Sequence, residues 1–287
     1  MRYALAIALA LILVGCGQDD GTAVDASGAA AQTAAQAAAQ PADDTAASVP
    51  ITEISPAVPV ISEDVAYGET EEQNLRGYLV LPADAVDPPG IVMIHEWWGL
   101  NDNIRAMARR LAGEGYAVLA VDLYGGQVAA NSADAQRLMT GVNTDREAAL
   151  ENLRQAYRYL DEFVLAPRIG VLGFGLGGDW ALEAGLQLGD ALDAVVMFYG
   201  QIITDPQQLA SLDAPLLGIF AEMDESIPAR EVLGFKGRLS EIGKTAQIDI
   251  YNGVDHAFMN PSGAAYNDAE AVRAWSAALA FLDERLR

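Results

Sequence analysis

The sequence predicts an α/β fold in which a mostly parallel central sheet is covered by helices on both faces. From residue 75 to the C-terminus, short continuous apolar segments of strand length alternate with longer amphipathic segments. Continuous apolar strands are typical of parallel sheets, because helices bury both faces of such sheets. About two hundred residues carry this alternation, which is the size of one domain.

Each element is predicted from its own pattern. Strands are expected where apolar residues run together, at residues 75–81, 90–95, 116–121, 169–172, 194–198, 215–220 and 246–251. Helices are expected where apolar residues recur at helical spacing, at residues 101–114, 132–140, 145–163, 176–188, 229–242 and 268–286. Ligands of such sheets bind beyond the carboxyl ends of the strands, so the loops there are the expected location of a site.

The first fifteen residues predict an export signal. Arg2 supplies a positive charge, and the apolar run 3–14 is too short to span a bilayer permanently but fits the core of a signal peptide. Residues 13–16 read Leu-Val-Gly-Cys and resemble the lipobox of bacterial lipoproteins, which implies cleavage before Cys16 and its lipidation. We therefore expect an exported lipoprotein anchored in the outer membrane or on the periplasmic side of the inner membrane. The alternative is an ordinary signal peptide with an incidental cysteine.

Residues 16–74 predict a disordered tether. The segment is rich in Ala, Gln and Pro, and it holds eleven Asp and Glu but no Lys or Arg. Such a composition offers little apolar side-chain area to offset the entropy of ordering. The domain is accordingly expected to occupy residues 75–287.

The overall charge excludes some partners. The chain carries a net charge of −23 at pH 7. Nucleic acid binding needs Lys and Arg to neutralise phosphates, and an anionic membrane surface repels an acidic chain. We expect no nucleic acid partner and no membrane contact beyond the lipid anchor. Cys16 is the only cysteine, so the chain cannot form an internal disulfide.

The predicted site centres on residues 173–178, Gly-Phe-Gly-Leu-Gly-Gly. An apolar strand precedes this segment and an apolar helical pattern follows it at once, so we expect a very tight turn. In an α/β-hydrolase such a turn, G-x-nucleophile-x-G, lifts the nucleophile above the sheet. Here the residue at the nucleophile position is Gly175.

Three other strand-end loops carry polar groups, at residues 95–101 (His-Glu-Trp-Trp-Gly-Leu-Asn), 221–228 (Ala-Glu-Met-Asp-Glu-Ser-Ile-Pro) and 252–258 (Asn-Gly-Val-Asp-His-Ala-Phe). A tight turn, an acid and a histidine in this order match the triad order of α/β-hydrolases. His256 is one of two histidines in the chain, and it falls where that order requires one.

Motifs in five segments cover nearly the whole domain: residues 95–101, 120–126 (Ala-Val-Asp-Leu-Tyr-Gly-Gly), 173–178, 217–228 and 255–261 (Asp-His-Ala-Phe-Met-Asn-Pro). With these motifs the region resembles the dienelactone hydrolase family. The resemblance implies an α/β-hydrolase fold and hydrolysis of lactones or esters of small carboxylic acids. It also implies that no metal or organic cofactor is required.

The resemblance also assigns roles to single residues. It implies that Asp224 is the acid of the triad, that His256 is the base, and that Glu96 holds a resting cysteine nucleophile. Gly175 stands where that cysteine is expected. Cys16 lies before the tether and cannot replace it.

Two backbone groups are expected to form an oxyanion hole. The N–H of Leu176 opens a helix, where the positive end of the helix dipole favours developing negative charge. The family resemblance implies that the N–H of Trp97 is the other half.

Several of these residues have a structural interpretation as well. Glu96 is alternatively a surface acid or a buried partner of Arg105 or Arg109, and His256 is alternatively a structural histidine.

Other polar and aromatic residues near the motifs are interpreted more simply. Trp97 and Trp98 either pack in the core or line the substrate site. Ser226 is interpreted as a turn residue rather than a nucleophile. Asp179 is interpreted as a first-turn acid that complements the helix dipole.

Three functions follow from these motifs. The first is a hydrolase that has lost covalent catalysis and retains slow, water-based hydrolysis. The second is a tethered binding protein for a small carboxylate or lactone. The third is dinucleotide binding, because residues 173–178 also fit G-x-G-x-x-G, but the next strand does not end in the acidic residue that would hold a ribose.

Overall fold

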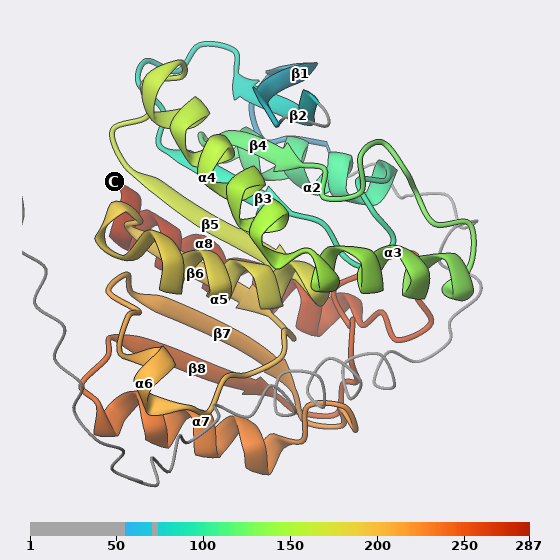
Figure 1. Ribbon diagram of the computed structural model, residues 1–287, viewed down its shortest axis with the longest axis vertical. Helices are drawn as coiled ribbons and strands as arrows, with labels where there is room; N and C mark the ends of the chain where they lie inside the picture. Colours follow the sequence, from blue (N-terminus) through green and yellow to red (C-terminus); the bar gives the residue numbers. More distant parts are fainter. Residues whose placement is uncertain (1–54, 71–73) are drawn as a thin grey trace, which may run out of the picture.

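Five strands in the middle of the sheet are buried at every residue, which explains why their sequences are continuous apolar runs. The computed structural model describes residues 55–70 and 74–287 (Figure 1). Its strands are β1 (Val60–Glu69), β2 (Asn74–Pro82), β3 (Gly90–Ile94), β4 (Ala117–Val121), β5 (Ile169–Phe174), β6 (Ala194–Phe198), β7 (Leu216–Ala221) and β8 (Ala246–Tyr251). Its helices are α2 (Asp102–Gly113), α3 (Ser132–Thr144), α4 (Arg146–Glu162), α5 (Leu176–Leu188), α6 (Pro206–Leu209), α7 (Ala229–Glu241) and α8 (Asp268–Leu286), with a short 3₁₀ turn at Gly189–Ala191.

The strands form one eight-stranded sheet in the order β1-β2-β4-β3-β5-β6-β7-β8. Strands β3 to β8 are parallel, and β1 and β2 are antiparallel at one edge. The carboxyl ends of β3, β5, β7 and β8 therefore meet at the same side of the sheet. This arrangement confirms the predicted fold class, a mostly parallel sheet of the α/β-hydrolase type.

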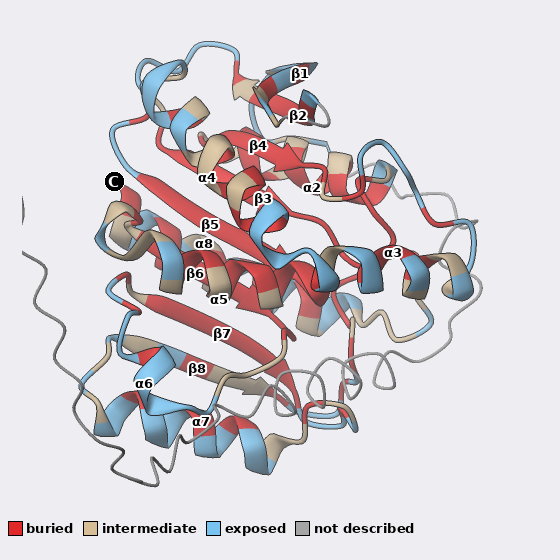
Figure 2. Ribbon diagram, viewed as in Figure 1, coloured by how far each residue is buried: buried red, intermediate tan, exposed pale blue. Residues whose placement is uncertain are grey.

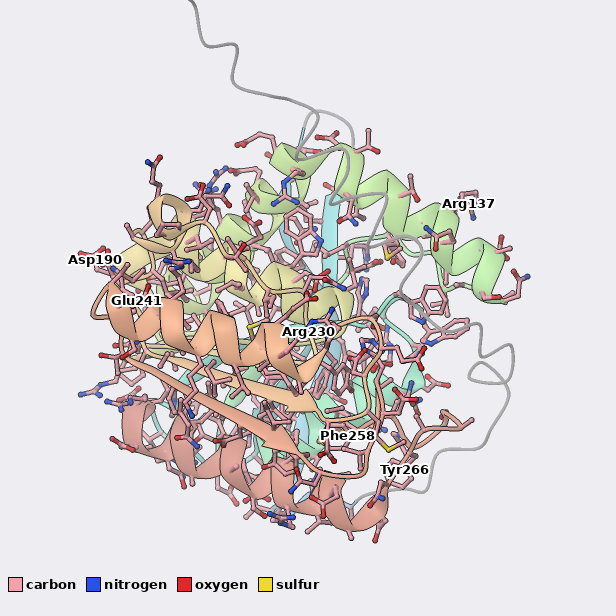
Figure 3. The ribbon with its side chains drawn as sticks, turned by 90° about the horizontal axis from the view of Figure 1, so that it is seen from below. Arg137, Asp190, Arg230, Glu241, Phe258 and Tyr266 are labelled. Carbon is pink, nitrogen blue, oxygen red and sulfur yellow. The ribbon has the colours of Figure 1, made fainter. Side chains whose placement is uncertain are left out.

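Helices cover both faces of the sheet and divide the core into two parts. One core cluster joins α3, α4, α5 and α7 to side chains such as Val92 and Ile94 of β3. The other joins α2 and α8 to the alternate side chains of the same strand, Ile91 and Met93. Figure 3 shows β7 and β8 between α7 on one side and α8 on the other. The burial colours of Figure 2 show the same arrangement, with buried strands and helices exposed only on their outer sides.

Side-chain caps begin most of the long helices. The side chains of Asn101, Asn131, Asp145 and Asn267 each accept a hydrogen bond from a backbone N–H of the first turn of α2, α3, α4 and α8. Helix α5 differs, because its N-cap is Gly175 and has no side chain to accept such a bond. The N–H groups at the start of α5 therefore remain available to another acceptor.

The predicted end of the tether at residue 74 is wrong. Residues 60–69, predicted to be disordered, form β1, which pairs with β2 along its length. Only Val65 and Tyr67 of this edge strand are buried, so its composition resembles that of a solvated segment. The hydroxyl of Tyr67 donates to Asn152 Oδ1 on α4 at 2.6 Å, and this contact fastens the strand to the domain.

The remaining N-terminal predictions, namely the export signal at 1–15, Cys16 and most of the tether, lie outside the described residues. Among the residues that the structure does describe, no helix is both long and apolar enough to cross a membrane.

We predict that Tyr67→Phe lowers the free energy of unfolding by about 1–3 kcal/mol, because it leaves the buried Asn152 Oδ1 without its donor. Urea denaturation measures the change. Tyr159→Phe, at a half-exposed position on α4, is the matched control and should have little effect. Equal stabilities of the two variants would show that β1 is not fastened in this way.

Candidate active site

The turn between β5 and α5 has the tight geometry that the glycine cluster predicts. Gly175 has φ 53° and ψ −117°, in the left-handed half of conformational space that favours glycine. Its N–H donates to the carbonyl of Phe198 at 2.9 Å, which holds the turn against the end of β6.

The neighbouring glycines are required because backbones approach closely. A Cβ on Gly173 would overlap the carbonyl of Gly177, and a Cβ on Gly177 would overlap the carbonyl of Ile94. A Cβ on Gly178 would lie 2.8 Å from the carbonyl oxygen of Phe198. These three glycines let the start of α5 pack against the sheet, so the pattern is explained without a bound dinucleotide.

Gly175 is different, because a side chain has room there. A Cβ on Gly175 would meet its nearest neighbour, Nε2 of His256, at 3.8 Å, which is an ordinary contact distance. The next contact is the ring of Tyr199 at 3.9 Å. The space at the apex of the turn therefore faces the imidazole of His256.

The acid and the histidine predicted from chain order are joined. Asp224 follows β7 and His256 follows β8, and Asp224 Oδ2 lies 2.7 Å from His256 Nδ1. Both side chains are buried. The other oxygen of Asp224 accepts from the N–H of Ser226 at 2.9 Å and from the N–H of Ile227 at 3.0 Å. The hydroxyl of Ser226 also donates to Asp224 at 2.5 Å, so Ser226 is a turn residue that supports the acid.

This pair shifts both pKa values toward the charged forms. Burial alone would lower the pKa of His256, but the hydrogen bond and charge of Asp224, with the charges of Glu96 and Asp179, raise that pKa. Burial alone would raise the pKa of Asp224, but His256 and the hydrogen bonds from Ser226 and Ile227 lower that pKa. When neutral, His256 therefore carries its proton on Nδ1 and exposes the lone pair of Nε2 toward Gly175.

Glu96 is buried at the same site and does not pair with an arginine. Its Oε1 accepts from the hydroxyl of Tyr199 at 3.2 Å, and its Oε2 accepts from Nδ2 of Asn260 at 2.7 Å. The alternative partners are engaged elsewhere: Arg105 pairs with Asp64 at 2.7 Å, and Arg109 donates to the hydroxyl of Tyr78 at 3.1 Å.

Two acids near His256 are held partly protonated at neutral pH. Burial raises the pKa of Glu96 to about 7, against the hydrogen bonds from Tyr199 and Asn260. Burial likewise raises the pKa of Asp179 to about 7. Asp179 accepts a hydrogen bond from the N–H of Gln201 and lies close enough to His256 for their charges to interact. Asp179 is thus a half-buried group beside His256 and not only a first-turn acid.

The backbone on the other side of Gly175 is fixed by His95. His95 Nδ1 lies 2.6 Å from the carbonyl of Glu96, and its Nε2 accepts from the N–H of Leu123 at 3.1 Å. Burial lowers the pKa of His95, which keeps the ring neutral and preserves both bonds. Because the Glu96 carbonyl and the Trp97 N–H belong to one trans peptide, they point in opposite directions. Fixing the carbonyl therefore fixes the N–H.

The aromatic residues of this loop pack in the interior. Trp97 and Trp98 are both buried and meet edge to face, with ring centroids 4.9 Å apart. The hydroxyl of Tyr124 donates to the carbonyl of Trp97 at 3.0 Å. The packing interpretation therefore accounts for both tryptophan side chains.

Sequence reasoning missed four polar residues that shape the site, namely His95, Asn103, Tyr199 and Asn260. Tyr199 has a positive φ of 39° directly after β6, and its ring meets that of His256 edge to face at 5.2 Å. Asn260 lies four positions after His256 in a motif already identified, so its place in the motif was the available signal.

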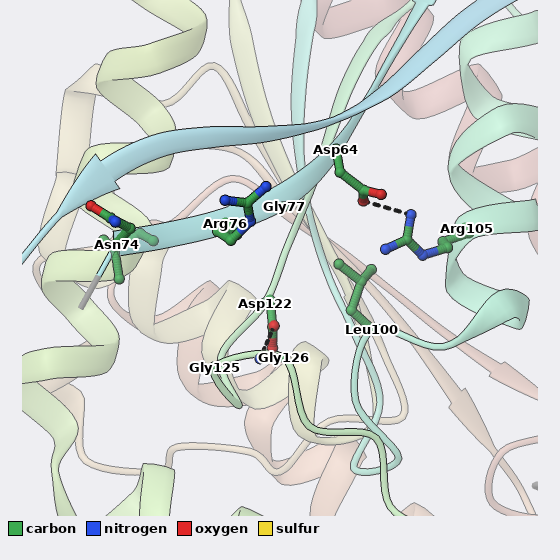
Figure 4. A pocket seen from close by; sticks show the side chains of 10 residues that line it. Asp64, Asn74, Arg76, Gly77, Leu100, Arg105, Asp122, Gly125 and Gly126 are labelled. Atoms are coloured by element: carbon green, nitrogen blue, oxygen red, sulfur yellow. Dashed lines mark hydrogen bonds and ion pairs between the residues drawn. The ribbon is translucent and has the colours of Figure 1, made fainter.

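Figure 4 shows a cavity that shares no lining residue with this cluster. It has a volume of about 420 Å³ and is lined by Asp64, Arg76, Arg105 and Asp122 among others. It contains none of the predicted site residues. In the described residues no group of three His, Cys, Asp or Glu side chains is placed to hold a metal ion.

We predict that Glu96 makes the protein less stable as pH rises. The folded chain keeps the proton of Glu96 up to about pH 7, whereas the unfolded chain releases it near the ordinary value of 4.5. The contribution of Glu96 to the free energy of unfolding is therefore fully present below pH 4.5 and is lost as pH rises through 7. Between pH 4.5 and 7 the free energy of unfolding should fall by up to about 3 kcal/mol more in the parent than in Glu96→Gln.

Urea denaturation at a series of pH values measures this difference. The control Glu225→Gln changes an exposed acid and should follow the parent. A Glu96→Gln curve parallel to that of the parent would contradict the assignment.

Comparison with known proteins gives matches over the same region. The model of the dienelactone hydrolase family matches residues 75–286. "Protein usf" of Aquifex pyrophilus is 32% identical over 220 residues, covering 74% of this chain and 94% of that protein. A protein of Aquifex aeolicus named "Putative carboxymethylenebutenolidase" is 31% identical over 221 residues, covering 75% of this chain and 95% of that protein.

A solved structure agrees. The crystal structure of a dienelactone hydrolase homologue from Klebsiella pneumoniae superposes with a TM-score of 0.71 at 26% identity, covering 79% of this chain and 99% of that one. With the family model spanning the domain, this chain belongs to the dienelactone hydrolase family.

Proposed function

We propose that this chain is a hydrolase of esters or lactones of small carboxylic acids in which glycine has replaced the nucleophile, so that its own catalysis is weak. One observation carries the proposal. Gly175 occupies the apex of the turn and has room for a side chain. A Cβ placed on Gly175 would lie 3.8 Å from Nε2 of His256. The base and its acid are in place, and the attacking atom is absent.

In the proposed reaction a water takes the place of the missing side chain. His256 accepts a proton from this water at Nε2 while the water oxygen attacks the carbonyl carbon. The tetrahedral intermediate then collapses, the bond to the leaving oxygen breaks, and His256 returns the proton to that oxygen. General-base assistance of this kind contributes about 10² to 10⁴ in rate.

The developing oxyanion needs hydrogen-bond donors. The N–H of Leu176 begins α5, where no side chain caps the helix. The N–H of Trp97 belongs to the peptide that His95 fixes through the Glu96 carbonyl. We propose that these two groups stabilise the oxyanion, a contribution of about 10² to 10³ per donor in comparable sites.

A second candidate is a non-catalytic, membrane-tethered binding protein for a small carboxylate or lactone. It is favoured by the same absence of a nucleophile, since loss of a nucleophile costs about 10⁶ in turnover and still leaves the surrounding binding groups intact. The two candidates differ in whether the parent protein turns over any ester through His256.

We predict that Gly175→Cys hydrolyses p-nitrophenyl acetate at least about a hundredfold faster than the parent, because a thiol next to His256 restores covalent catalysis. The change adds a side chain at positive φ, which costs about 1–2 kcal/mol of stability. Release of p-nitrophenol measures the rate.

Two controls separate the causes. Gly175→Ala adds the same backbone strain without a nucleophile and should show no gain. His256→Ala should abolish both the gain and the parent's residual rate. A parent rate that is unchanged by His256→Ala would leave the binding protein as the better description, and no gain in Gly175→Cys would show that the acyl-transfer site is not functional.

We also propose that the chain is exported and anchored through a lipid on Cys16. The support is the apolar run of residues 3–14 followed by Leu-Val-Gly-Cys. Expressed in a bacterial host, the parent should incorporate labelled palmitate and fractionate with membranes, and Cys16→Ser should do neither. Membrane association of an unlabelled parent would contradict the lipid anchor.

A further inference from the structure

The hydrogen bonds beside Glu96 fix the orientation of two buried amides. The backbone N–H of Ser262 can only donate and faces Oδ1 of Asn260, so Asn260 presents its Nδ2 to Glu96, at 2.7 Å. The oxygen of Asn260 must then point the other way. It accepts from Nδ2 of Asn103 at 3.0 Å and from the N–H of Ser262 at 3.0 Å. Nδ2 of Asn103 also donates to the hydroxyl oxygen of Ser262 at 2.7 Å.

This chain of bonds leaves one acceptor unused. Asn103 is 7% exposed, and in the described part of the chain its Oδ1 has no hydrogen-bond partner. The amide cannot be reversed, because Nδ2 is needed where it lies. A buried acceptor without a donor is unfavourable by a factor of about ten or more in an equilibrium constant. A donor from outside the protein is therefore expected at this atom.

Asn103 and Glu96 line the same small cleft. The cleft has a volume of about 10 Å³, which is room for one water-sized group. Tyr199 and Asn260 also line it, and apolar side chains such as Met107 and Phe174 close it. The cleft lies next to the turn, because Phe174, the chain neighbour of Gly175, lines it together with Tyr199, whose ring lies 3.9 Å from a Cβ placed on Gly175.

The ionisable group in the wall of the cleft is an acid. Glu96 is in its wall, and Asp179 and Asp224 act on the neighbouring His256. The described residues that line the cleft include no Lys or Arg.

The Aquifex aeolicus relative is named for an activity on carboxymethylenebutenolide, a lactone that carries a carboxylate. The described lining side chains offer such a carboxylate no cation. The donors of Asn103, Tyr199 and Asn260 already donate within the protein.

We propose that the cleft beside Gly175 selects neutral lactones or esters that carry a hydroxyl or N–H donor, and that it rejects substrates with a carboxylate at that position. The inference rests on the proposed function for the identity of the ligand as an ester or lactone. A hydroxyl donates to Asn103 Oδ1 and replaces the missing partner. A carboxylate meets another acceptor there and is repelled by ionised Glu96.

Three lactones of one ring size test the proposal: γ-butyrolactone with a hydroxyl, a methyl or a carboxylate at carbon 3. The hydroxyl and methyl groups have similar volumes, so their comparison isolates the donor. The carboxylate adds both charge and volume, and the variant Glu96→Gln separates the effect of charge. Because binding is measured rather than turnover, the test does not depend on whether the parent hydrolyses esters.

Binding is measured by NMR on protein labelled at histidine. The chain has two histidines, so the spectrum contains two imidazoles. The ring with the raised pKa is His256, and the ring with the lowered pKa is His95. The titrations are run at about pH 8, where Glu96 is ionised. We expect the hydroxyl lactone to bind about tenfold more tightly than the methyl lactone. The carboxylate lactone should bind about tenfold to a hundredfold more weakly than the methyl lactone.

Two variants assign the effects to atoms. Asn103→Leu should remove the preference for the hydroxyl and leave the rejection of the carboxylate. Glu96→Gln should reduce that rejection, whereas Glu225→Gln, an exposed acid with the same change in charge, should not.

The comparison of the three lactones on the parent protein needs no variant to fold. Equal or tighter binding of the carboxylate lactone overturns the proposal, as does a methyl lactone that binds as well as the hydroxyl lactone. Failure of all three to shift His256 also overturns it. Gly175→Cys reports on the proposed function separately, through p-nitrophenyl acetate.

Discussion

The hydrogen bond between Asp224 and His256, at 2.7 Å, is the interaction on which the site depends. It joins the loops after β7 and β8, which are neighbours in the sheet. By holding the proton of the ring on Nδ1, it turns the basic nitrogen toward the apex of the β5–α5 turn. The charge and the geometry of the base are thus both set by a carboxylate that never needs to touch a ligand.

A second network does the same for the opposite wall of the site. The loop after β3 is fixed by His95, whose two bonds require a neutral ring, and by Glu96, which is tied to Tyr199 and Asn260. This loop is therefore held by two buried side chains, Tyr199 and Asn260, and by the backbone N–H of Leu123. A neutral histidine and a partly protonated acid can stand next to each other here because burial opposes charge on both.

The alternating strands and helices of the domain could be predicted from the sequence. Apolar runs such as 194–198 predict strands directly, and the order of the strand-end loops predicts the contact between Asp224 and His256. Strand β1 was missed because an edge strand with two buried side chains has little apolar signal. Asn103 and Tyr199 were missed for another reason: their roles depend on contacts with Asn260 and Glu96 far away in sequence, which no local pattern encodes. The export signal and the lipid anchor stay predictions.

The three glycines around the turn differ from Gly175 in how tightly the surrounding backbone encloses them. Any side chain at Gly173, Gly177 or Gly178 would break the packing of α5 on the sheet, whereas the apex has kept its space. Glycine codons of the GGT and GGC type become cysteine codons through a single base change. Where position 175 is encoded by such a codon, one base change places a thiol at the apex without rebuilding the scaffold.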